Sequence, residues 1–593
     1  MLTAHRKDSI STFKSAGAPL SILAISFGLS LFTIAYKRAL DPLFGGASTK
    51  KYLNHVVHAC TMLAVLLPKP AICQALLVLG TLVQIVPHST YWVSVHAGRY
   101  GNPIAGPLVT HILVLAPVTF LSASLVMRIN PYLAIVVLAA NALRPRLIAE
   151  VIGHSFSLDA QKDYIFLLLG VLLYAAWAWV KRNTANKSAS GMRKDSGVVI
   201  FIRRYFPLII PAAFILFPSL RSPSLSASQT FPYHSAAYPL RILYSQESLT
   251  GVVVVGELLD APKGSAPDAL HSLRYLRVSH SLLGGVWTGD MVDTIGNSPP
   301  QTDEFGTPIG DSIYSAFVLQ EAVRLINDIS RCQDSSCGNA LIIGVGTGIA
   351  ADALARHGVT TTLVEIDPAV YNAARRFFGL RHPGDDKVFL EDARDWLDKR
   401  VATQPISSVS TRKFDIVIHD CFSGGGVPKQ LFSLEFWDQL KTTMTSRGVV
   451  AINFVGKLGS KSSQAVVTTL LKAFGRCRAF HDALDSIPDQ RFQDEYMNMV
   501  FFCSISPSPL TFRAPIEDDY LNSHLRHFVL SSLEKREIPI SKIRNTRVRS
   551  KEAEETFVLT DKNNKLDEWQ RDDALEHWKI MRKVLPDVIW ETF

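Results

Sequence analysis

Residues 339–370, NALIIGVGTGIAADALARHGVTTTLVEIDPAV, constrain the fold of this chain more than any other stretch. An apolar run, 340–343, is typical of a strand buried on both faces. Three glycines follow it at alternate positions and let backbone approach a ligand closely: Gly344, Gly346 and Gly348. Residues 349–356 are expected to form a helix. A second apolar run, 361–364, ends at Glu365, where a carboxylate can accept hydrogen bonds from both hydroxyls of a ribose. The stretch predicts an α/β unit that binds a nucleoside.

The chain has 593 residues, too many for a single core, and a domain for every 100 to 200 residues gives about three to five units. Apolar residues crowd the first third, whereas most charged residues follow it. The net charge of +9 is not accompanied by a basic stripe interleaved with aromatic residues, so we expect no nucleic-acid partner.

Apolar segments in the first third predict a bundle of about six or seven transmembrane helices within residues 1–220. The candidate spans are 19–36, 52–67, 71–86, 106–127, 131–143, 164–180 and 205–217. The first could be a cleaved signal peptide, but we favour a retained anchor because further spans follow it. We therefore expect a multi-pass integral membrane protein whose partner is the lipid bilayer. Basic residues occur in loops on both sides, so the positive-inside rule does not orient it. Cofactor supply favours a cytosolic soluble part.

The remaining chain divides by composition into four parts. Residues 221–238 are rich in Ser, Pro and Ala and form a linker. In residues 239–300, two stretches, 241–258 and 272–287, alternate between apolar and polar residues and contain many β-branched side chains. They predict the strands of a small β domain. Residues 301–513 have the mixed pattern of a Rossmann-like α/β domain. Residues 514–593 predict a helical C-terminal extension that packs on the catalytic sheet.

The seven cysteines are too few and too scattered for a disulfide framework. Cys332 and Cys337 could bridge a small loop or begin a metal site, but no second pair with zinc spacing follows, so we expect no metal. The others are interpreted as buried small residues, among them Cys60, Cys73, Cys477 and Cys503.

Three further stretches extend the nucleoside signal. Residues 387–396, KVFLEDARDW, predict a short strand followed by Asp392, where a carboxylate can bind an adenine amino group. Residues 414–422, FDIVIHDCF, predict a buried strand that places Asp420 at the carboxyl edge of a parallel sheet, where ligands bind. Residues 448–454 are the next strand. The glycine loop lacks the Lys-Ser/Thr of a Walker sequence, which disfavours a nucleoside triphosphate. A tight structural turn and a dinucleotide site also fit the spacing, but the acidic positions fit an adenosyl-sulfonium ligand better.

Residues 241–506 resemble the spermidine and spermine synthase family, which consists of aminopropyltransferases with the class I methyltransferase fold. The motifs that carry the resemblance are SLLGG, GDSIYSAFVLQEAV, LIIGVGTG, VEIDPAV, LEDARDW and HDCFSGGGVPKQLFSLEFW. The last is similar to the family's D-S-S-D-P-x-G-P-A-x-x-L-F-x-x-x-F signature. The resemblance implies a membrane-fused member with decarboxylated S-adenosylmethionine as co-substrate, a small amine as acceptor, and assembly as a homodimer.

The same resemblance implies roles for single residues. It places Gly344, Gly346, Thr347 and Gly348 around the cofactor, Glu365 on the ribose and Asp392 on the adenine ring. Asp420 matches the catalytic acid, and Tyr314 resembles the tyrosine that helps hold the substrate amine. Aminopropyl transfer is an in-line displacement at a carbon next to positive sulfur, so Asp420 could orient the amine and accept its proton. The structural alternative is that Asp420 only caps the glycine loop.

Two departures from the family pattern leave the reaction open. Thr347 stands where the family has an acidic residue in its glycine loop, and Ser423 stands where it has the second Asp of D-S-S-D. Both lost carboxylates would contact cationic amines. The leading hypothesis is a membrane-anchored aminopropyltransferase. The alternatives are a methyltransferase that uses S-adenosylmethionine, favoured by Thr347, and a non-catalytic membrane transporter or scaffold with a ligand-sensing domain.

Overall fold

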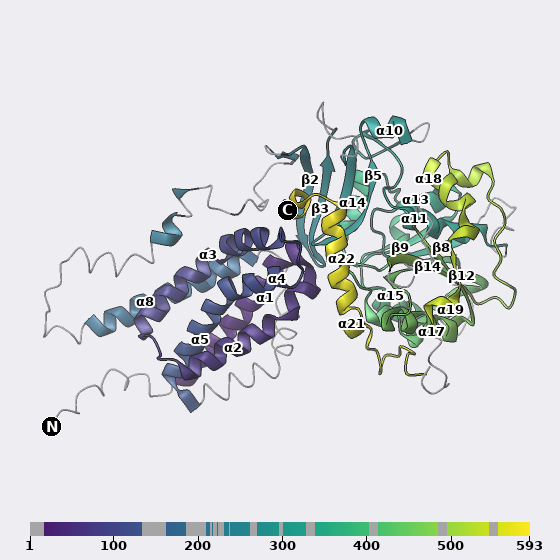
Figure 1. Cartoon of the computed structure of the whole chain (residues 1–593). Coiled ribbons are helices and arrows are strands. Elements are labelled where there is room, and N and C mark those ends of the chain that lie inside the picture. Colours follow the sequence, from purple (N-terminus) through teal and green to yellow (C-terminus); the bar gives the residue numbers. More distant parts are fainter. Residues whose placement is uncertain are drawn as a thin grey trace, which may run out of the picture. The chain divides into compact units, whose positions relative to one another are not determined.

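The computed structural model describes residues 17–132, 162–185, 209–213, 216–217, 222, 231–235, 238–260, 270–295, 300–327, 338–402, 413–483, 495–544 and 555–593. The chain forms two compact units (Figure 1). The helical unit comprises residues 1–224 with 590–592, and the α/β unit comprises residues 225–589 with 593.

The helical unit is built from apolar helices: α1 (Gly17–Lys51), α2 (Leu53–Leu66), α3 (Ile72–Gly98), α4 (Ala105–Thr110), η2 (His111–Leu115), α5 (Ala116–Ile129) and α8 (Lys162–Ala185). Four helical stretches are long and apolar enough to cross a membrane: Pro19–Lys51, Ile72–Gly98, Ala105–Ile129 and Ile165–Arg182. The expected span 52–67 corresponds to the shorter α2. The expected span 131–143 and the linker 221–238 lie for the most part outside the described residues, and about half of the expected span 205–217 does too.

Five antiparallel strands form the first sheet of the α/β unit, in the order β1-β2-β3-β4-β5. Their bounds are β1 (Tyr233–His234), β2 (Leu240–Ser248), β3 (Gly251–Leu258), β4 (Leu273–Val278) and β5 (Ser281–Trp287). Strands were predicted in 241–258 and 272–287, and the structure has two in each stretch. Alternating β-branched residues favour strands, and the left-handed backbone of Ser279 (φ 48°) lies in the turn between β4 and β5.

The second sheet has eight strands in the order β10-β9-β8-β11-β12-β14-β13-β15. They are β8 (Asn339–Ile343), β9 (Thr360–Val364), β10 (Val388–Phe389), β11 (Phe414–His419), β12 (Met444–Lys457), β13 (Arg476–His481), β14 (Tyr496–Ser504) and β15 (Glu537–Ile538). The pairings from β10 to β12 are parallel, whereas β14 is antiparallel to β12 and β13. The strand order reverses between β8 and β11, which is the Rossmann-like arrangement expected from the sequence.

Helices cover both faces of this sheet (Figure 1). They include α11 (Ser315–Glu321), α13 (Ile349–Arg356), α14 (Pro368–Phe378), α15 (Ala393–Ala402), α16 (Leu434–Thr442), α17 (Lys461–Phe474), α18 (His524–Ser531) and α22 (Arg571–Val584). Alternate residues of β8 point to opposite cores. Leu341 packs with Trp396 of α15 and Trp437 of α16 on one face. Ile342 packs with Leu354 of α13 on the other.

The interpretation of Cys477 and Cys503 as separate buried residues is wrong. They stand directly opposite each other on β13 and β14 and form a disulfide. The disulfide was not predicted because the two strands that bring these residues together have no strong signal in the sequence. Cys332 and Cys337 lie outside the described residues.

Breaking this disulfide is expected to lower the stability of the α/β unit by about 3 kcal/mol, because the cross-link closes a chain loop in the unfolded state. The double substitution Cys477→Ala with Cys503→Ala should lower the thermal unfolding midpoint, whereas Cys60→Ala, at a free cysteine, leaves the cross-link intact. The measurement is thermal unfolding together with alkylation of thiols before and after reduction. Two additional reactive thiols in the denatured, unreduced protein would contradict the assignment.

Candidate active site

The candidate site lies where the strand order reverses, at the carboxyl ends of β8 and β11. The glycine loop follows β8, and Asp420 follows β11. The Asp420 N–H donates to the Ile343 carbonyl at 2.9 Å, which continues the parallel pairing past the strand ends. In open α/β sheets, ligands bind in the crevice outside the strands at this point. The topology therefore brings the predicted glycine loop and the predicted catalytic acid to the same place.

Position 344 needs a glycine because the glycine loop lies very close to the backbone of Asp420. Its φ is 82°, a left-handed value that disfavours a side chain. A Cβ built on Gly344 would lie 2.0 Å from the Asp420 carbonyl oxygen, which is backbone and cannot rotate away. Gly346 and Gly348 also have positive φ values, of 54° and 82°. The loop therefore needs glycine because its backbone turns sharply over the end of β11.

Glu365 lies against the glycine loop. Its carboxylate accepts hydrogen bonds from the Val345 N–H at 2.8 Å and from the Asp367 N–H at 3.0 Å. Burial raises the pKa of Glu365, and the two backbone donors oppose that rise. The carboxylate is thus fixed beside the loop, at the position from which it was predicted to reach a ribose.

Asp392 caps a helix, and Thr347 is buried beneath the small sheet. Asp392 Oδ1 accepts from the Arg394 N–H at 2.8 Å, at the start of α15, as a helix cap does. Thr347 is only 1% exposed, and its hydroxyl has no hydrogen-bond partner among the residues that the structure describes. A Cβ on Gly284 of β5 would meet that hydroxyl at 2.5 Å, so the hairpin of the small sheet packs over the glycine loop.

Asp420 is held by two amide side chains that the sequence analysis did not select. Gln320 Nε2 donates to Asp420 Oδ2 at 2.7 Å, and Asn453 Nδ2 donates to Asp420 Oδ1 at 2.9 Å. Burial raises the pKa of Asp420, and the two amide hydrogen bonds oppose the rise. The predicted strand end located Asp420, but Gln320 comes from α11 and Asn453 from mid-β12, so only the tertiary fold brings them together.

Tyr314 precedes α11 and is half-buried in the same part of the unit. Burial, and then the charge of Asp482, raises the pKa of Tyr314 above its ordinary value. Asp482 was not predicted. It follows β13 directly, and its Oδ2 accepts from Asn498 Nδ2 at 3.0 Å. Ser315 Oγ donates to the Asp482 carbonyl at 2.7 Å. The same strand-end rule that located Asp420 would have located Asp482 if β13 had been recognised.

The loop after Asp420 is shaped by the C-terminal extension. The Val427 N–H donates to Gln570 Oε1 at 2.6 Å, and a Cβ on Gly425 would lie 2.4 Å from the Ala574 Cα of α22. Ser423 is exposed in this loop, and its N–H donates to the Gly426 carbonyl at 2.9 Å. The glycines of the loop thus allow α22 to pack against it.

This arrangement can hold an acceptor and take up a proton. Burial raises the pKa of the half-buried Asp420 carboxyl, and its two neutral amide donors hold it in a position to accept a proton. Among the residues that the structure describes, no group of three or more His, Cys, Asp or Glu side chains could hold a metal ion. The side chains that gather here are carboxylates, amides and a phenol, and they lie beside the glycine loop.

Comparison with known proteins places the chain in a family. Residues 320–470 match the family model of the spermine/spermidine synthase domain. An N-terminal histidine N-methyltransferase of Emericella nidulans is 30% identical over 538 residues, which are 87% of this chain and 86% of that protein. A polyamine aminopropyltransferase of Vibrio vulnificus is 28% identical over 155 residues, 26% of this chain and 48% of that protein.

A solved spermidine synthase from Thermotoga maritima aligns with 49% of this chain and 88% of its own, with 15% identity and a TM-score of 0.28, too low to carry an argument. The fold assignment rests instead on the strand order and on the glycine loop at the reversal point. Both sequence relatives are transferases, and the Emericella protein matches the chain over nearly its full length. The chain therefore belongs to the same family as the Emericella protein, contains a region that matches the spermine/spermidine synthase domain, and is an enzyme of the transferase class.

Proposed function

We propose that the chain is an S-adenosylmethionine-dependent methyltransferase that acts on a nitrogen of an N-terminal histidine, and that its apolar helices hold it in a lipid bilayer. The observation that carries the proposal is the extent of the match to the Emericella N-terminal histidine N-methyltransferase. That match includes much of the helical unit, whereas the aminopropyltransferase match covers only 26% of the chain.

The charges of the site support a methyl donor that keeps its carboxylate. An acidic residue in the glycine loop would repel the amino-acid carboxylate of S-adenosylmethionine and would attract the free amine of the decarboxylated form. Thr347 is neutral and buried at that position. Ser423, which stands where the family has the second Asp of D-S-S-D, is also neutral. Of the three acidic positions that the aminopropyltransferase pattern would place here, Asp420 alone is retained.

The reaction needs only the groups that the site presents. The nitrogen lone pair attacks the methyl carbon, the carbon–sulfur bond breaks, and its electron pair stays on sulfur to give S-adenosylhomocysteine. Methylation of the unprotonated ring nitrogen makes the ring cationic, and the ring then loses the proton of its other nitrogen, which Asp420 would accept. Glu365 and the glycine loop would hold the nucleoside, and Asp392 the adenine ring. Gln320 and Asn453 keep the Asp420 carboxylate in one orientation.

The test is methyl transfer by the full chain, in detergent or lipid nanodiscs, from methyl-labelled S-adenosylmethionine to a synthetic peptide that begins with histidine. A peptide of identical sequence that begins with alanine is the matched control. We expect label in the histidine peptide alone, as a mass increase of one methyl group confined to its first residue. Equal labelling of both peptides, or labelling of neither, would overturn the proposal.

Aminopropyl transfer remains the second candidate because the family model that matches residues 320–470 is that of spermine/spermidine synthases. It predicts a different product from the same protein. Transfer from decarboxylated S-adenosylmethionine to putrescine or spermidine, without methylation of the histidine peptide, would favour this candidate.

A further inference from the structure

We propose that Asp482 is a second acceptor-binding carboxylate, which holds the α-ammonium group of the peptide N-terminus while Asp420 serves the nitrogen that is methylated. The inference rests on the proposed function and names the part of the substrate that the site recognises. It assigns a role to a residue that was not predicted from the sequence.

Four buried carboxylates of the α/β unit pair with arginine, whereas others, such as Glu365, are held by backbone donors. Glu321 and Asp311 pair with Arg526, while Glu257 and Asp303 pair with Arg274. Asp482 differs from these four. Within the described part of the chain it has no ion-pair partner, and its side chain accepts from the neutral amide of Asn498. Asp420 is held in the same way by two amides. The negative charge of both is therefore available to a bound cation.

Helix α11 contacts both acidic residues, through the backbone of Asp482 and the side chain of Asp420. Ser315, at its first position, donates to the Asp482 carbonyl, and Gln320, near its last, donates to the Asp420 carboxylate. At about 1.5 Å of rise per residue, these two donors lie roughly 7.5 Å apart along the helix axis. The two acidic residues are therefore held at different levels of the same helix.

The pairing of β12 with β14 also places Asp420 and Asp482 on the same side of the sheet. Asn453 stands opposite Val500, and Asn498 stands opposite Val455. Because paired residues of antiparallel strands share a face, and side chains alternate along a strand, both asparagines point to the same face. They are two positions apart, or about 7 Å. Asn453 holds Asp420 and Asn498 holds Asp482, so both acids are presented from one surface.

The chemistry around Asp482 suits an ammonium ligand. Burial raises the pKa of Asp482 to about 6, against the opposing hydrogen bond from Asn498 and the nearby charge of Arg536, so the carboxylate is ionised at neutral pH. Arg536 Nη1 donates a hydrogen bond to the Ala483 carbonyl at 2.8 Å. Tyr314 adds a phenol close by. An α-amine is mostly protonated at pH 7, whereas a histidine ring is mostly neutral. The ammonium is thus the group that a carboxylate selects.

The experiment measures binding of two peptides to the full chain saturated with S-adenosylhomocysteine. One peptide begins with a free histidine, and the other is its N-acetylated form. The wild type is expected to prefer the free amine by about ten- to a hundredfold, the usual value of a hydrogen bond to a charged group. Asp482→Asn should abolish this preference. Asp420→Asn, the matched carboxylate control, should retain it, and both variants should bind S-adenosylhomocysteine as the wild type does.

Two readouts separate substrate binding from a structural role. In the methylation assay, Asp482→Asn should raise KM for the peptide about tenfold or more with a smaller change in kcat. Its thermal midpoint should be unchanged or higher, because removal of a partly desolvated charge favours folding at neutral pH. A retained preference for the free amine would overturn the inference, as would a lower thermal midpoint with weakened cofactor binding. If the wild type binds neither peptide, the proposed function itself falls, and the assignment of Asp482 falls with it.

Discussion

Replacing Asp420 by asparagine is expected to lower kcat by about 10²- to 10⁴-fold, the usual contribution of a positioned base, while the protein still binds its cofactor. Asparagine keeps the size of the side chain but cannot accept a proton. Turnover is measured with the histidine peptide, and cofactor binding by calorimetry with S-adenosylhomocysteine. Turnover within a few-fold of the wild type would show that Asp420 only caps the loop.

The pH dependence gives a second check on Asp420. Burial raises the pKa of this carboxyl, so it becomes protonated at a higher pH than an ordinary aspartate. Only the ionised form accepts a proton, and activity should therefore fall as the pH is lowered through this raised pKa. The residual activity of Asp420→Asn should lack that acidic limb. An identical acidic limb in wild type and variant would assign it to another group.

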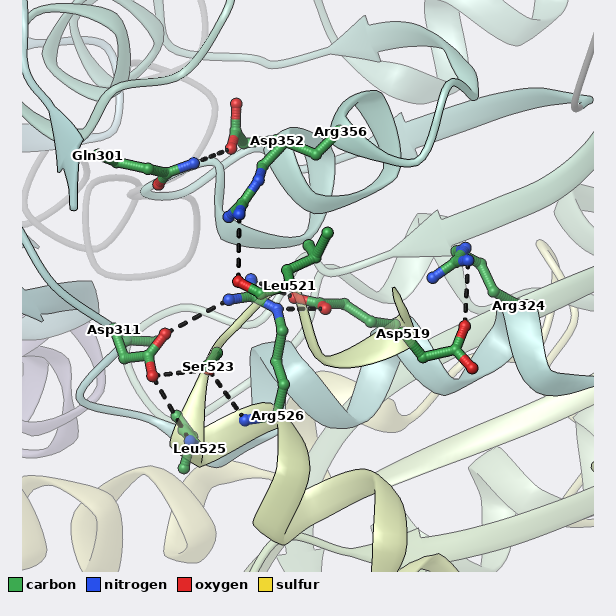
Figure 2. A network of polar contacts seen from close by, with 12 residues as sticks. Gln301, Asp311, Arg324, Asp352, Arg356, Asp519, Leu521, Ser523, Leu525 and Arg526 are labelled. Atoms are coloured by element: carbon green, nitrogen blue, oxygen red, sulfur yellow. Dashed lines mark hydrogen bonds and ion pairs between the residues drawn. The ribbon is translucent and has the colours of Figure 1, made fainter. Parts of the chain in front are cut away.

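Loss of Arg526 is expected to lower the stability of the α/β unit by about 3–5 kcal/mol, the usual result of breaking a buried ion pair at one partner. Its guanidinium donates to both Glu321 oxygens at 2.8 and 2.9 Å. It also approaches Asp311 at 3.4 Å (Figure 2). Ser523 Oγ also donates to Asp311, at 2.6 Å. Arg526→Met would leave two buried carboxylates without their cation.

The control for this prediction is Lys579→Met. Lys579 pairs with Glu576 on the surface of α22, with side chains 45% and 38% exposed. Exposed pairs contribute about 0–1 kcal/mol, so this variant should unfold near the wild-type midpoint. Thermal or urea unfolding compares the two variants. Because Glu321 ends α11, which also carries Gln320, Arg526→Met should reduce turnover as well as stability. Equal unfolding midpoints for the two variants would contradict the account of the network.

Several features of the site could be predicted from the sequence because they depend on neighbours along the chain. The apolar runs, the three glycines and Glu365 are local signals, and the structure places them in the expected order. Residues 349–356 form the expected helix, which corresponds to α13. Asp420 was located because a polar residue after a buried strand emerges at the ligand edge of a parallel sheet.

The rest of the site depends on contacts between distant segments. Gln320 and Asp420 are 100 positions apart, and Ser315 and Asp482 are 167 apart. No local pattern marks such pairs. Asp482 and the disulfide were missed for one shared reason, the unrecognised β13. The disulfide also bears on location, since disulfides persist mainly in oxidising compartments.

The proposed function requires that the chain uses the carboxylated, methyl-donating cofactor. It is tested most directly by calorimetric titration of the full chain with S-adenosylmethionine and with its decarboxylated form under identical conditions. A neutral Thr347 in the glycine loop predicts tighter binding of S-adenosylmethionine, by about tenfold or more, since the loop has no carboxylate to repel the methionine carboxylate. Tighter binding of decarboxylated S-adenosylmethionine would contradict the claim and restore aminopropyl transfer as the function.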